Sequence, residues 1–279
     1  MKITRTVFLG TPDFAATILS KLLSSQRIEV AGVFTQPDRP GRRGKAPLAP
    51  PVKELASSHG VPVHQPSTLD RESMDTLREL EPDALAVAAY GLLLPPEALG
   101  AAPMGAINVH ASLLPRYRGA APIQWALING EVVTGVTTML MQPGMDTGPI
   151  LRQKALAIGI HDTAGSLHDQ LADLGGDLLL DTLQALQEGT LLPVDQDPDL
   201  ASYAPKLDKD ARHIDWDRPA WEVHNRIRAL HPSPGAFFSL RSAGGKGELR
   251  VRPHPGGLGE ELGQDPEPGS IQGLDGEGN

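Results

Sequence analysis

The first half of the chain alternates short apolar runs with longer amphipathic stretches, and this alternation is the strongest constraint on the fold. The apolar runs predict strands at residues 3–9, 29–35, 85–89 and 106–110. Repeated βα units of this kind build an open, mostly parallel sheet with helices on its faces. We therefore predict an α/β fold of the Rossmann-like type.

The turn after the first predicted strand marks the start of a helix. Thr11-Pro12-Asp13 supplies an N-cap threonine, a proline at the first helical position and an acid near the positive helix end. The helix is expected to run to about residue 24. Because this turn lacks the G-x-G-x-x-G pattern, we do not expect a dinucleotide cofactor.

Two further elements complete the first domain, which we place at residues 1–189. A Val- and Thr-rich run predicts a strand at 133–141. Leucines then recur at helical spacing along one buried face of a long helix that ends near residue 189. These leucines are Leu167, Leu171, Leu174 and Leu178.

The second half of the chain changes character. Residues 190–206 are polar and contain prolines, which predicts a linker, and residues 207–279 form a second, smaller domain. Within that domain the pattern predicts a helix at 221–230 and strands at 237–240 and 248–252. The segment from 243 onward contains 11 glycines and 4 prolines in 37 residues, so we expect it to be partly disordered.

Composition excludes several classes of protein. The chain has no cysteine, which excludes disulfides, thiolate metal sites and a nucleophilic cysteine. Its N-terminal apolar stretch is too short and wrongly flanked for a signal peptide. The longest nearly apolar run, 84–96, falls below the roughly 18 residues of a membrane span. We expect a cytoplasmic protein.

The net charge of −9 excludes a global basic field of the kind that coats nucleic acid. Any contact with RNA must therefore be local. The stretch 38–53 is the candidate, because it holds five basic residues and one acidic residue. Most such charge runs are simply solvated loops, and that alternative stays open at this point.

Asn108 and His110 are the first candidates for chemistry. They end an apolar run, and residues two apart in a strand point to the same face, roughly 7 Å from each other. Open α/β sheets bind ligands at the carboxyl ends of such strands. Taken alone, the pair is explained equally well by a capping asparagine and a satisfied core histidine.

A second polar candidate is Asp146, which a Pro-Gly turn presents between two glycines. Its ordinary interpretation is an Asx turn. Between the two candidates runs a loop, residues 111–124, which mixes apolar and basic residues as functional loops often do.

Together these segments resemble the 10-formyltetrahydrofolate-dependent formyltransferases. The motif NVHASLLPRYRGAAPIQ begins at Asn108, and Gly-Met-Asp-Thr-Gly follows at 144–148. The resemblance runs from about residue 6 to about residue 234, and is greatest to the branch whose acceptor is initiator methionyl-tRNA. Supporting motifs are LGTPDFAA at 9–16, FTQPDRP at 34–40, AAYGLLLP at 88–95, YAPKL at 203–207 and IDW at 214–216.

The resemblance implies a reaction and its residues. A formyl group passes from 10-formyltetrahydrofolate to the amino group of initiator methionyl-tRNA, which supplies N-formylmethionyl-tRNA for translation initiation. The implied catalytic residues are Asn108, His110 and Asp146. The implied folate-binding residues are Ala89, Tyr90, Gly91, Leu94, Ser112, Leu113, Leu114 and Pro115, and the implied tRNA-binding residues are Arg39, Arg42, Arg43 and Lys45.

The resemblance also bears on the C-terminal domain. The family ends in a small tRNA-binding barrel of the oligonucleotide-binding (OB) type, and this chain ends roughly a few dozen residues before such a barrel would close, which leaves strand edges unpaired. Residues 207–279 are therefore expected to be a truncated or diverged OB-like domain.

Two residues of the implied folate-binding wall have an ordinary structural explanation. Ala88 is expected to be a buried strand residue, and Leu93 is expected to fill the loop as a plug. We expect a monomer.

The residue types suit the chemistry independently of the family. When an amine attacks a formyl carbonyl, negative charge develops on oxygen, the attacking nitrogen loses a proton and the leaving nitrogen gains one. Asn108 can donate its amide to that oxygen. His110 can move the proton or, when charged, help to bind the oxyanion, and Asp146 can orient His110 and favour its charged form. The reaction needs no metal.

Three alternatives remain at the level of sequence. A sugar-nucleotide N-formyltransferase shares the Asn, His and Asp set, but the basic loop and the C-terminal domain favour tRNA. A glycinamide ribonucleotide formyltransferase is expected to be a shorter, single-domain chain. A non-catalytic RNA-binding protein on the same scaffold would have no reason to keep all three polar groups.

Overall fold

The structure is a computed structural model that describes residues 3–41, 46–241 and 248–259. The chain divides into two compact units, each described here by itself. The first comprises Met1–Pro122, Val133–Ala157 and His168–Pro205, and the second comprises Ile123–Val132, Ile158–Leu167 and Lys206–Asn279.

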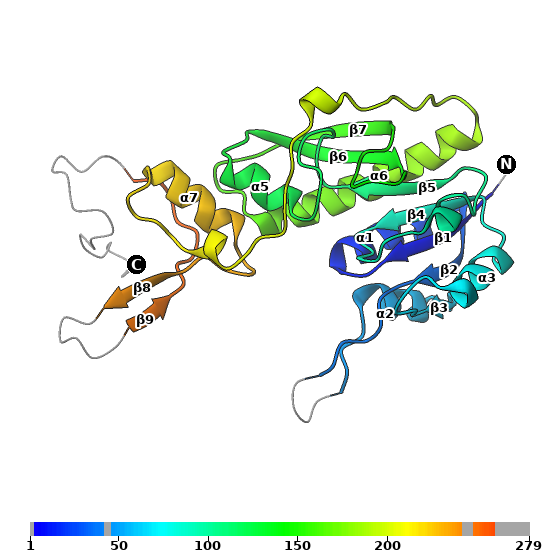
Figure 1. The fold of residues 1–279 in the computed structure, drawn as a ribbon, viewed down its shortest axis with the longest axis horizontal. Helices are drawn as coiled ribbons and strands as arrows, with labels where there is room; N and C mark the ends of the chain where they lie inside the picture. Colours follow the sequence, from blue (N-terminus) through cyan, green and yellow to red (C-terminus); the bar gives the residue numbers. More distant parts are fainter. Residues whose placement is uncertain (1–2, 42–45, 242–247, 260–279) are drawn as a thin grey trace. The chain divides into compact units, whose positions relative to one another are not determined.

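A seven-stranded sheet organises the first unit, in the order β3-β2-β1-β4-β5-β6-β7 (Figure 1). The first five strands in this order run parallel, whereas β5, β6 and β7 are joined by antiparallel pairs. This confirms the predicted open, mostly parallel sheet. The strands are β1 (Thr4–Gly10), β2 (Ile28–Phe34), β3 (Val63–His64), β4 (Ala84–Ala88), β5 (Ala106–His110), β6 (Val133–Leu140) and β7 (Ile150–Ala157).

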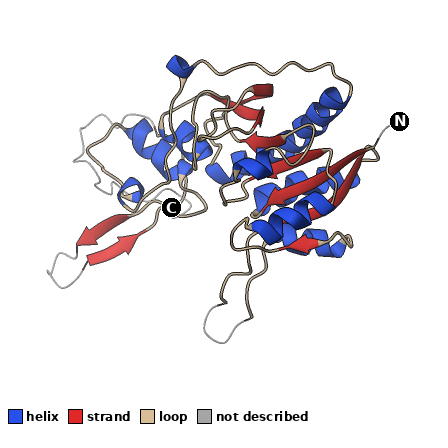
Figure 2. Ribbon diagram, turned by 45° about the vertical axis from the view of Figure 1, so that its right-hand side comes forward, coloured by secondary structure: helices blue, strands red, loops and turns tan. Residues whose placement is uncertain are grey.

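Helices lie beside this sheet and connect its strands (Figure 2). Their buried faces supply much of the core; in α1, for example, Ile18, Leu19 and Leu22 are fully buried. The helices of this unit are α1 (Asp13–Ser24), α2 (Pro51–Ser58), α3 (Arg71–Glu79), α4 (Pro96–Leu99) and, from His168 onward, α6 (Ala164–Gln187). In α6 three of the four leucines of the predicted stripe, Leu167, Leu171 and Leu178, are buried, and Leu174 is half-buried.

Two local predictions need correction. The predicted N-cap, Thr11, is not the cap of α1: Pro12 occupies that position without a side-chain hydrogen bond. The Thr11 hydroxyl instead donates to the carbonyl of Tyr90, 2.9 Å away, so a tertiary partner replaces the local one. Strand β7 was not predicted from the sequence, because its residues 152–155 are exposed and polar or small, so that no apolar run marks the strand.

Close packing of α6 holds the strand that carries Asn108 and His110. A Cβ atom on Gly175 of α6 would lie 2.8 Å from the side chain of Val109 in β5. Real Cβ atoms do not approach that closely, so only glycine lets the helix come this near. The strand is thereby fixed from its rear face, where Val109 points, while its two polar neighbours point to the other face.

The described part of the second unit contains α5 (Pro122–Ile128) from Ile123 onward, the helix α7 (Ala220–Ala229), and an antiparallel pair of strands, β8 (Phe238–Arg241) and β9 (Glu248–Val251). The last three are the elements that the sequence predicted in this unit. These match the elements expected at 221–230, 237–240 and 248–252. A small core of Ile214, Val223, Leu230 and Ala236 lies beneath them. The predicted disorder concerns residues that lie largely outside the described ranges, and the OB-like barrel stays a prediction.

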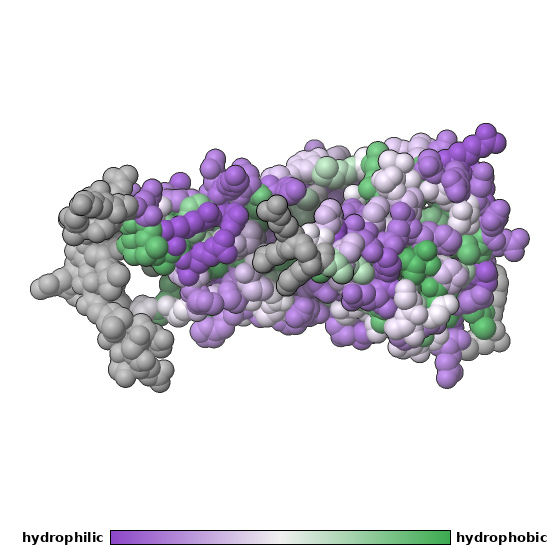
Figure 3. Space-filling model, turned by 90° about the horizontal axis from the view of Figure 1, so that it is seen from below, coloured by the Kyte–Doolittle hydropathy of each residue, from purple (hydrophilic) through white to green (hydrophobic). Residues whose placement is uncertain are grey.

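The surface is mixed in character. On the face drawn in Figure 3, hydrophobic residues form separate patches within a mainly hydrophilic surface. Among the described residues, no helix combines the length and the apolar character needed to cross a membrane.

Candidate active site

Strand β5 places the two predicted polar residues in the interior of the sheet. Asn108 pairs with Val87 of β4 on one side and with Met139 of β6 on the other, and His110 pairs with Thr137 of β6. Neighbours on both sides thus hold the backbone of Asn108, and β6 holds that of His110 at the carboxyl end of the strand.

The imidazole of His110 is buried, with 7% of its side chain exposed. Its Nε2 lies 2.9 Å from the carbonyl oxygen of Tyr117. A carbonyl can only accept, so Nε2 is the nitrogen that carries a hydrogen in this bond. The other nitrogen, Nδ1, lies 3.7 Å from Oδ2 of Asp146. A proton on Nδ1 would therefore face a carboxylate.

Asp146 is held in an uncommon backbone conformation. Its φ is 52°, in the left-handed region that non-glycine residues rarely adopt. The backbone N–H of Gly119, whose own φ is 113°, donates to Oδ2 of Asp146 at 2.9 Å. Tyr117, the partner of His110, also has a positive φ, 61°. Strained residues of this kind tend to cluster at functional sites.

Asn108 completes the group. It is partly exposed, and no hydrogen bond of its side-chain amide is found within the described residues. An amide N–H on the same strand face as His110 is therefore available to a ligand. The structure thus brings His110 and Asp146 together directly and places Asn108 beside them through the strand register.

The predicted folate-binding loop, residues 112–115, is fixed by polar contacts with the neighbouring strands. Thr137 of β6 receives a hydrogen bond from the N–H of Leu114 at 3.1 Å and donates to the carbonyl of Ser112 at 2.6 Å. Gln153 of β7 donates to the carbonyl of Leu114 at 2.7 Å. Pro115 and Leu113 are half-buried.

The second predicted folate segment, residues 89–94, is held at its centre. The carbonyl of Tyr90 accepts hydrogen bonds from the hydroxyl of Thr11 and, at 3.2 Å, from the side chain of Gln36. Ala89 and Gly91, on either side of Tyr90, have φ values of 43° and 83°.

The side chains of this segment differ in their surroundings. The Tyr90 hydroxyl is buried without a partner among the described residues, and burial raises the pKa of Tyr90 to about 12. Leu94 is buried, and Ala88, as expected, is a buried strand residue. The expectation that Leu93 plugs the loop is wrong, because 91% of its surface is exposed.

The predicted tRNA-binding residues are only partly within the described ranges. Arg39 is exposed, and it pairs with Leu48 through two backbone hydrogen bonds of 3.0 and 2.9 Å that close the base of the loop. Arg42, Arg43 and Lys45 lie outside the described residues. Lys53 is not free to bind phosphate, because its ammonium group contacts both oxygens of Asp38 at 2.8 Å. Hydrogen bonds from Gln65 and Lys53 lower the pKa of the Asp38 carboxyl.

Sequence reasoning missed two residues next to this site, Gln196 and Arg118. Gln196 lies in the predicted linker, and its side chain contacts both Arg118 and the Asp146 turn. Only the polar, proline-containing composition of residues 190–206 was visible in the sequence, and it gave no sign of these contacts. Within the described residues, no group of three or more His, Cys, Asp or Glu side chains has the arrangement of a metal site.

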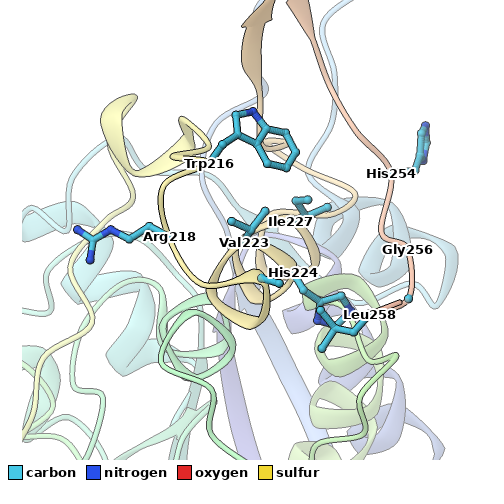
Figure 4. A pocket seen from close by; sticks show the side chains of 10 residues that line it. Trp216, Arg218, Val223, His224, Ile227, His254, Gly256 and Leu258 are labelled. Carbon is cyan, nitrogen blue, oxygen red and sulfur yellow. The ribbon is translucent and has the colours of Figure 1, made fainter. Parts of the chain in front are cut away.

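A cavity of about 390 Å³ lies in the second unit. It is lined by residues of α7, of the segment before it and of the segment after β9, among them Trp216, Val223, His224 and His254 (Figure 4). His224 is 8% exposed, and burial lowers the pKa of its imidazole. The cavity contains no predicted site residue.

An α/β fold that carries Asn, His and Asp side chains at the carboxyl end of its sheet is the arrangement expected of a formyl-transferring enzyme, and comparison with known proteins agrees with this class. Residues 4–183 match the formyl transferase family and residues 206–278 match the C-terminal domain of formyl transferases. The chain belongs to the formyl transferase family, as the motifs predicted.

The relatives narrow this class. The methionyl-tRNA formyltransferase of Nitratidesulfovibrio vulgaris (strain Hildenborough) is 53% identical over 269 residues, which cover 96% of this chain and 81% of that protein. The methionyl-tRNA formyltransferase of Trichlorobacter lovleyi is 50% identical over 240 residues, covering 86% and 76%. This similarity supports the methionyl-tRNA branch over the sugar branch.

Solved structures agree on the fold. A 4-N formyltransferase from Francisella tularensis superposes with a TM-score of 0.69 at 15% identity, covering 91% of this chain and 99% of that one. A sugar N-formyltransferase from Shewanella sp. gives 0.67 at 19% identity, with 92% and 99% covered. At such low identity these similarities show the architecture alone.

Proposed function

We propose that this chain transfers the formyl group of 10-formyltetrahydrofolate to the amino group of initiator methionyl-tRNA. The observation that carries the proposal is the placement of Nδ1 of His110 at 3.7 Å from Asp146, on the strand face that also presents Asn108. The high identity to methionyl-tRNA formyltransferases supports the choice of acceptor.

Each of the three residues has a distinct role in this proposal. The amide of Asn108 donates to the formyl oxygen, on which negative charge develops as the amine attacks. Nδ1 of His110 takes the proton that the attacking nitrogen loses and returns it to the departing nitrogen, because Nε2 is engaged with Tyr117. Asp146 orients the ring and stabilises its positive charge while the proton is there.

The donor is proposed to bind between the two fixed segments, 89–94 and 112–115. Folates present a flat ring with polar edges, and ligand sites for such molecules combine apolar walls with a few fixed backbone groups. Leu113 is half-buried and offers apolar surface, the buried Leu94 supports the other segment from beneath, and hydrogen bonds hold the carbonyls of Tyr90 and Leu114. These residues suit the donor, and their part in binding it is a proposal.

The acceptor is proposed to be contacted by the basic loop, with Arg39, Arg42, Arg43 and Lys45 near its phosphates. With a net charge of −9 the chain as a whole repels RNA, so a local cluster of cations has to supply the attraction. The protein is proposed to act in the cytoplasm as a monomer and without a metal.

The test is an acceptor competition. The purified chain is incubated with 10-formyltetrahydrofolate and, separately, with initiator methionyl-tRNA, an amino-sugar nucleotide or no acceptor, and the products are identified by mass spectrometry. We expect the formyl group only on the methionyl amine. Formylation of the sugar amine with no product on tRNA would refute the proposal in favour of the sugar-nucleotide alternative.

A further inference from the structure

The side chain of Gln196 uses both ends of its amide, and its oxygen and nitrogen partners belong to the loops around Arg118 and Asp146, while Sδ of Met139 in β6 lies 4.0 Å from its Nε2. Its Nε2 donates to the carbonyl of Asp146 at 2.8 Å and to that of Gly148 at 2.7 Å. Its Oε1 accepts from Nε and Nη2 of Arg118, at 3.0 and 2.7 Å. Because carbonyls only accept and a guanidinium only donates, the amide can adopt just one orientation.

Arg118 makes this contact costly to lose. Its side chain is 5% exposed, and among the described residues no carboxylate forms an ion pair with it. A buried cation needs hydrogen-bond acceptors. The side-chain oxygen of Gln196 accepts from two N–H groups of the Arg118 guanidinium. The backbone of Arg118 is tied to the same segment, since its N–H donates to Ser202 at 2.8 Å and its carbonyl accepts from Ala204 at 2.7 Å.

Gln196 therefore joins the two loops that position Asp146. The carboxylate of Asp146 is held by the N–H of Gly119, the neighbour of Arg118, and its main-chain carbonyl is held by Gln196 itself. The left-handed conformation of Asp146 is unfavourable for a residue with a side chain, so it persists only where surrounding contacts impose it. Gln196 supplies one of those contacts at the backbone.

We propose that Gln196 is a positioning residue for formyl transfer, which holds the Asp146 carboxylate at its working distance from His110. This inference rests on the proposed function. The segment that the sequence marks as a linker thus takes part in assembling the active site. Since a misplacement of about 1 Å can cost about 100-fold in rate, we expect loss of Gln196 to lower kcat by about 10- to 100-fold.

Two variants separate positioning from folding. Gln196→Ala removes every hydrogen bond of this side chain. Gln196→Glu keeps an oxygen for Arg118, and with it the buried cation's partner, but removes both donors to the Asp146 turn. Both are expected to lower kcat and to leave the KM for the formyl donor and for tRNA near the wild-type values. A Gln196→Glu protein that unfolds at the wild-type temperature would exclude a global folding defect.

The matched control is Gln184, another glutamine that binds an arginine. Its side chain accepts from Arg27 and donates to Glu188 at 2.8 Å, on helix α6 and without contact to Asp146. Gln184→Ala is expected to leave kcat unchanged.

A double-variant cycle measures whether the rate losses at Gln196 and Asp146 depend on each other. A purely structural role of Gln196 would give no such dependence. In an Asp146→Asn background, Gln196→Glu should cost little further rate, because the group that it positions is already disabled, whereas independent sites add their losses. Single-turnover assays with long sampling measure these slow variants.

The outcomes are distinct. An additive loss in the double variant, an unchanged kcat in both Gln196 variants, or a raised KM for tRNA at unchanged kcat would overturn the role of Gln196 while leaving the proposed function in place. A wild-type chain that fails to formylate methionyl-tRNA would overturn the proposed function, and the proposed role of Gln196 with it.

Discussion

Two loops leave the same edge of the parallel sheet, yet they are held in different ways. Residues 111–121, the catalytic loop, follow β5, and residues 35–50, the basic loop, follow β2. The catalytic loop is bonded to β6, to the Asp146 turn and to residues 202–204. At its start, residues 35–38 of the basic loop are bonded to neighbouring elements and to Lys53, whereas from Arg39 to Pro50 the described residues form one non-local backbone pair, Arg39 with Leu48.

The difference suits two kinds of task. Catalytic groups must be held in a fixed geometry, and a loop with many non-local hydrogen bonds provides that. Attraction to phosphates depends mainly on the number and sign of charges and tolerates variation in geometry. The comparison predicts that changes at the catalytic loop and its partners alter turnover, while changes at the basic loop alter affinity for tRNA.

The largest effects are expected at Asn108, His110 and Asp146. Replacing Asn108 by Ala should lower kcat by about 100- to 1000-fold, the usual effect of removing an oxyanion donor, and His110→Ala and Asp146→Ala should each cost at least about tenfold. Steady-state kinetics with circular dichroism as a folding check measure this. Near-normal turnover in any one variant would remove that residue from the catalytic set.

Paired changes at these positions sharpen the same prediction. If His110 and Asp146 act as one unit, the double variant should be about as slow as the slower single variant. If the rate loss of the double variant equals the product of the two single losses, His110 and Asp146 act independently. Asp146 would then not work through His110.

A smaller effect is expected in the basic loop. Arg39→Ala and Arg42→Ala should raise the KM for methionyl-tRNA several-fold by removing phosphate contacts, with kcat and folate affinity unchanged. The difference between variant and wild type should shrink as salt rises. The variant makes fewer phosphate contacts and releases fewer counterions on binding, so its affinity depends less on salt. Arg78→Ala is the control, because Arg78 is also an exposed arginine but pairs with Asp75 on α3. Parallel loss of folate affinity would show that the loop shapes the folate pocket instead.

The smallest effect concerns stability. His64 stacks on Phe34 with ring centroids 4.9 Å apart, and burial lowers the pKa of its imidazole below the ordinary 6.5. The unfolded chain therefore takes up a proton that the folded chain resists, so this stabilisation is present above pH 6.5 and is lost as the pH falls below it.

His64→Phe tests this sign. The variant should lose less Tm than the wild type between pH 7.5 and pH 5.5, roughly the range in which histidine titrates. His59→Gln is the control, because His59 is exposed at the end of α2. An identical loss of Tm in wild type and His64→Phe would contradict the assignment.

Much of the fold was predictable because its elements are encoded locally. The strands β1, β4 and β5 are apolar runs that are largely buried on both faces, β2 is an apolar run whose last three residues are buried, and the leucine stripe of α6 is periodic. β7 was not predictable, because its exposed residues carry no apolar pattern, and Thr11 was misassigned because a distant carbonyl competes for its hydroxyl.

The candidate site divides in the same way. Asn108, His110 and Asp146 lie in motifs that can be recognised in one sequence, and the structure brings the last two within 3.7 Å. Gln196 was missed because its partners lie 48 to 78 positions away in the chain. Contacts of that kind depend on the fold and leave no mark on the local sequence.

We infer that the catalytic loop, together with the His110 and Asp146 side chains that it holds, sets the rate, and that the basic loop sets the affinity for tRNA. One kinetic series decides this, in which the single-turnover rate at saturating tRNA and the KM for tRNA are measured in His110→Ala and in Arg39→Ala. The account predicts a reduced rate with a near-normal KM in the first variant and a raised KM with a near-normal rate in the second. If both variants lost rate and affinity together, or if the two effects were exchanged, the division of function between the loops would be wrong.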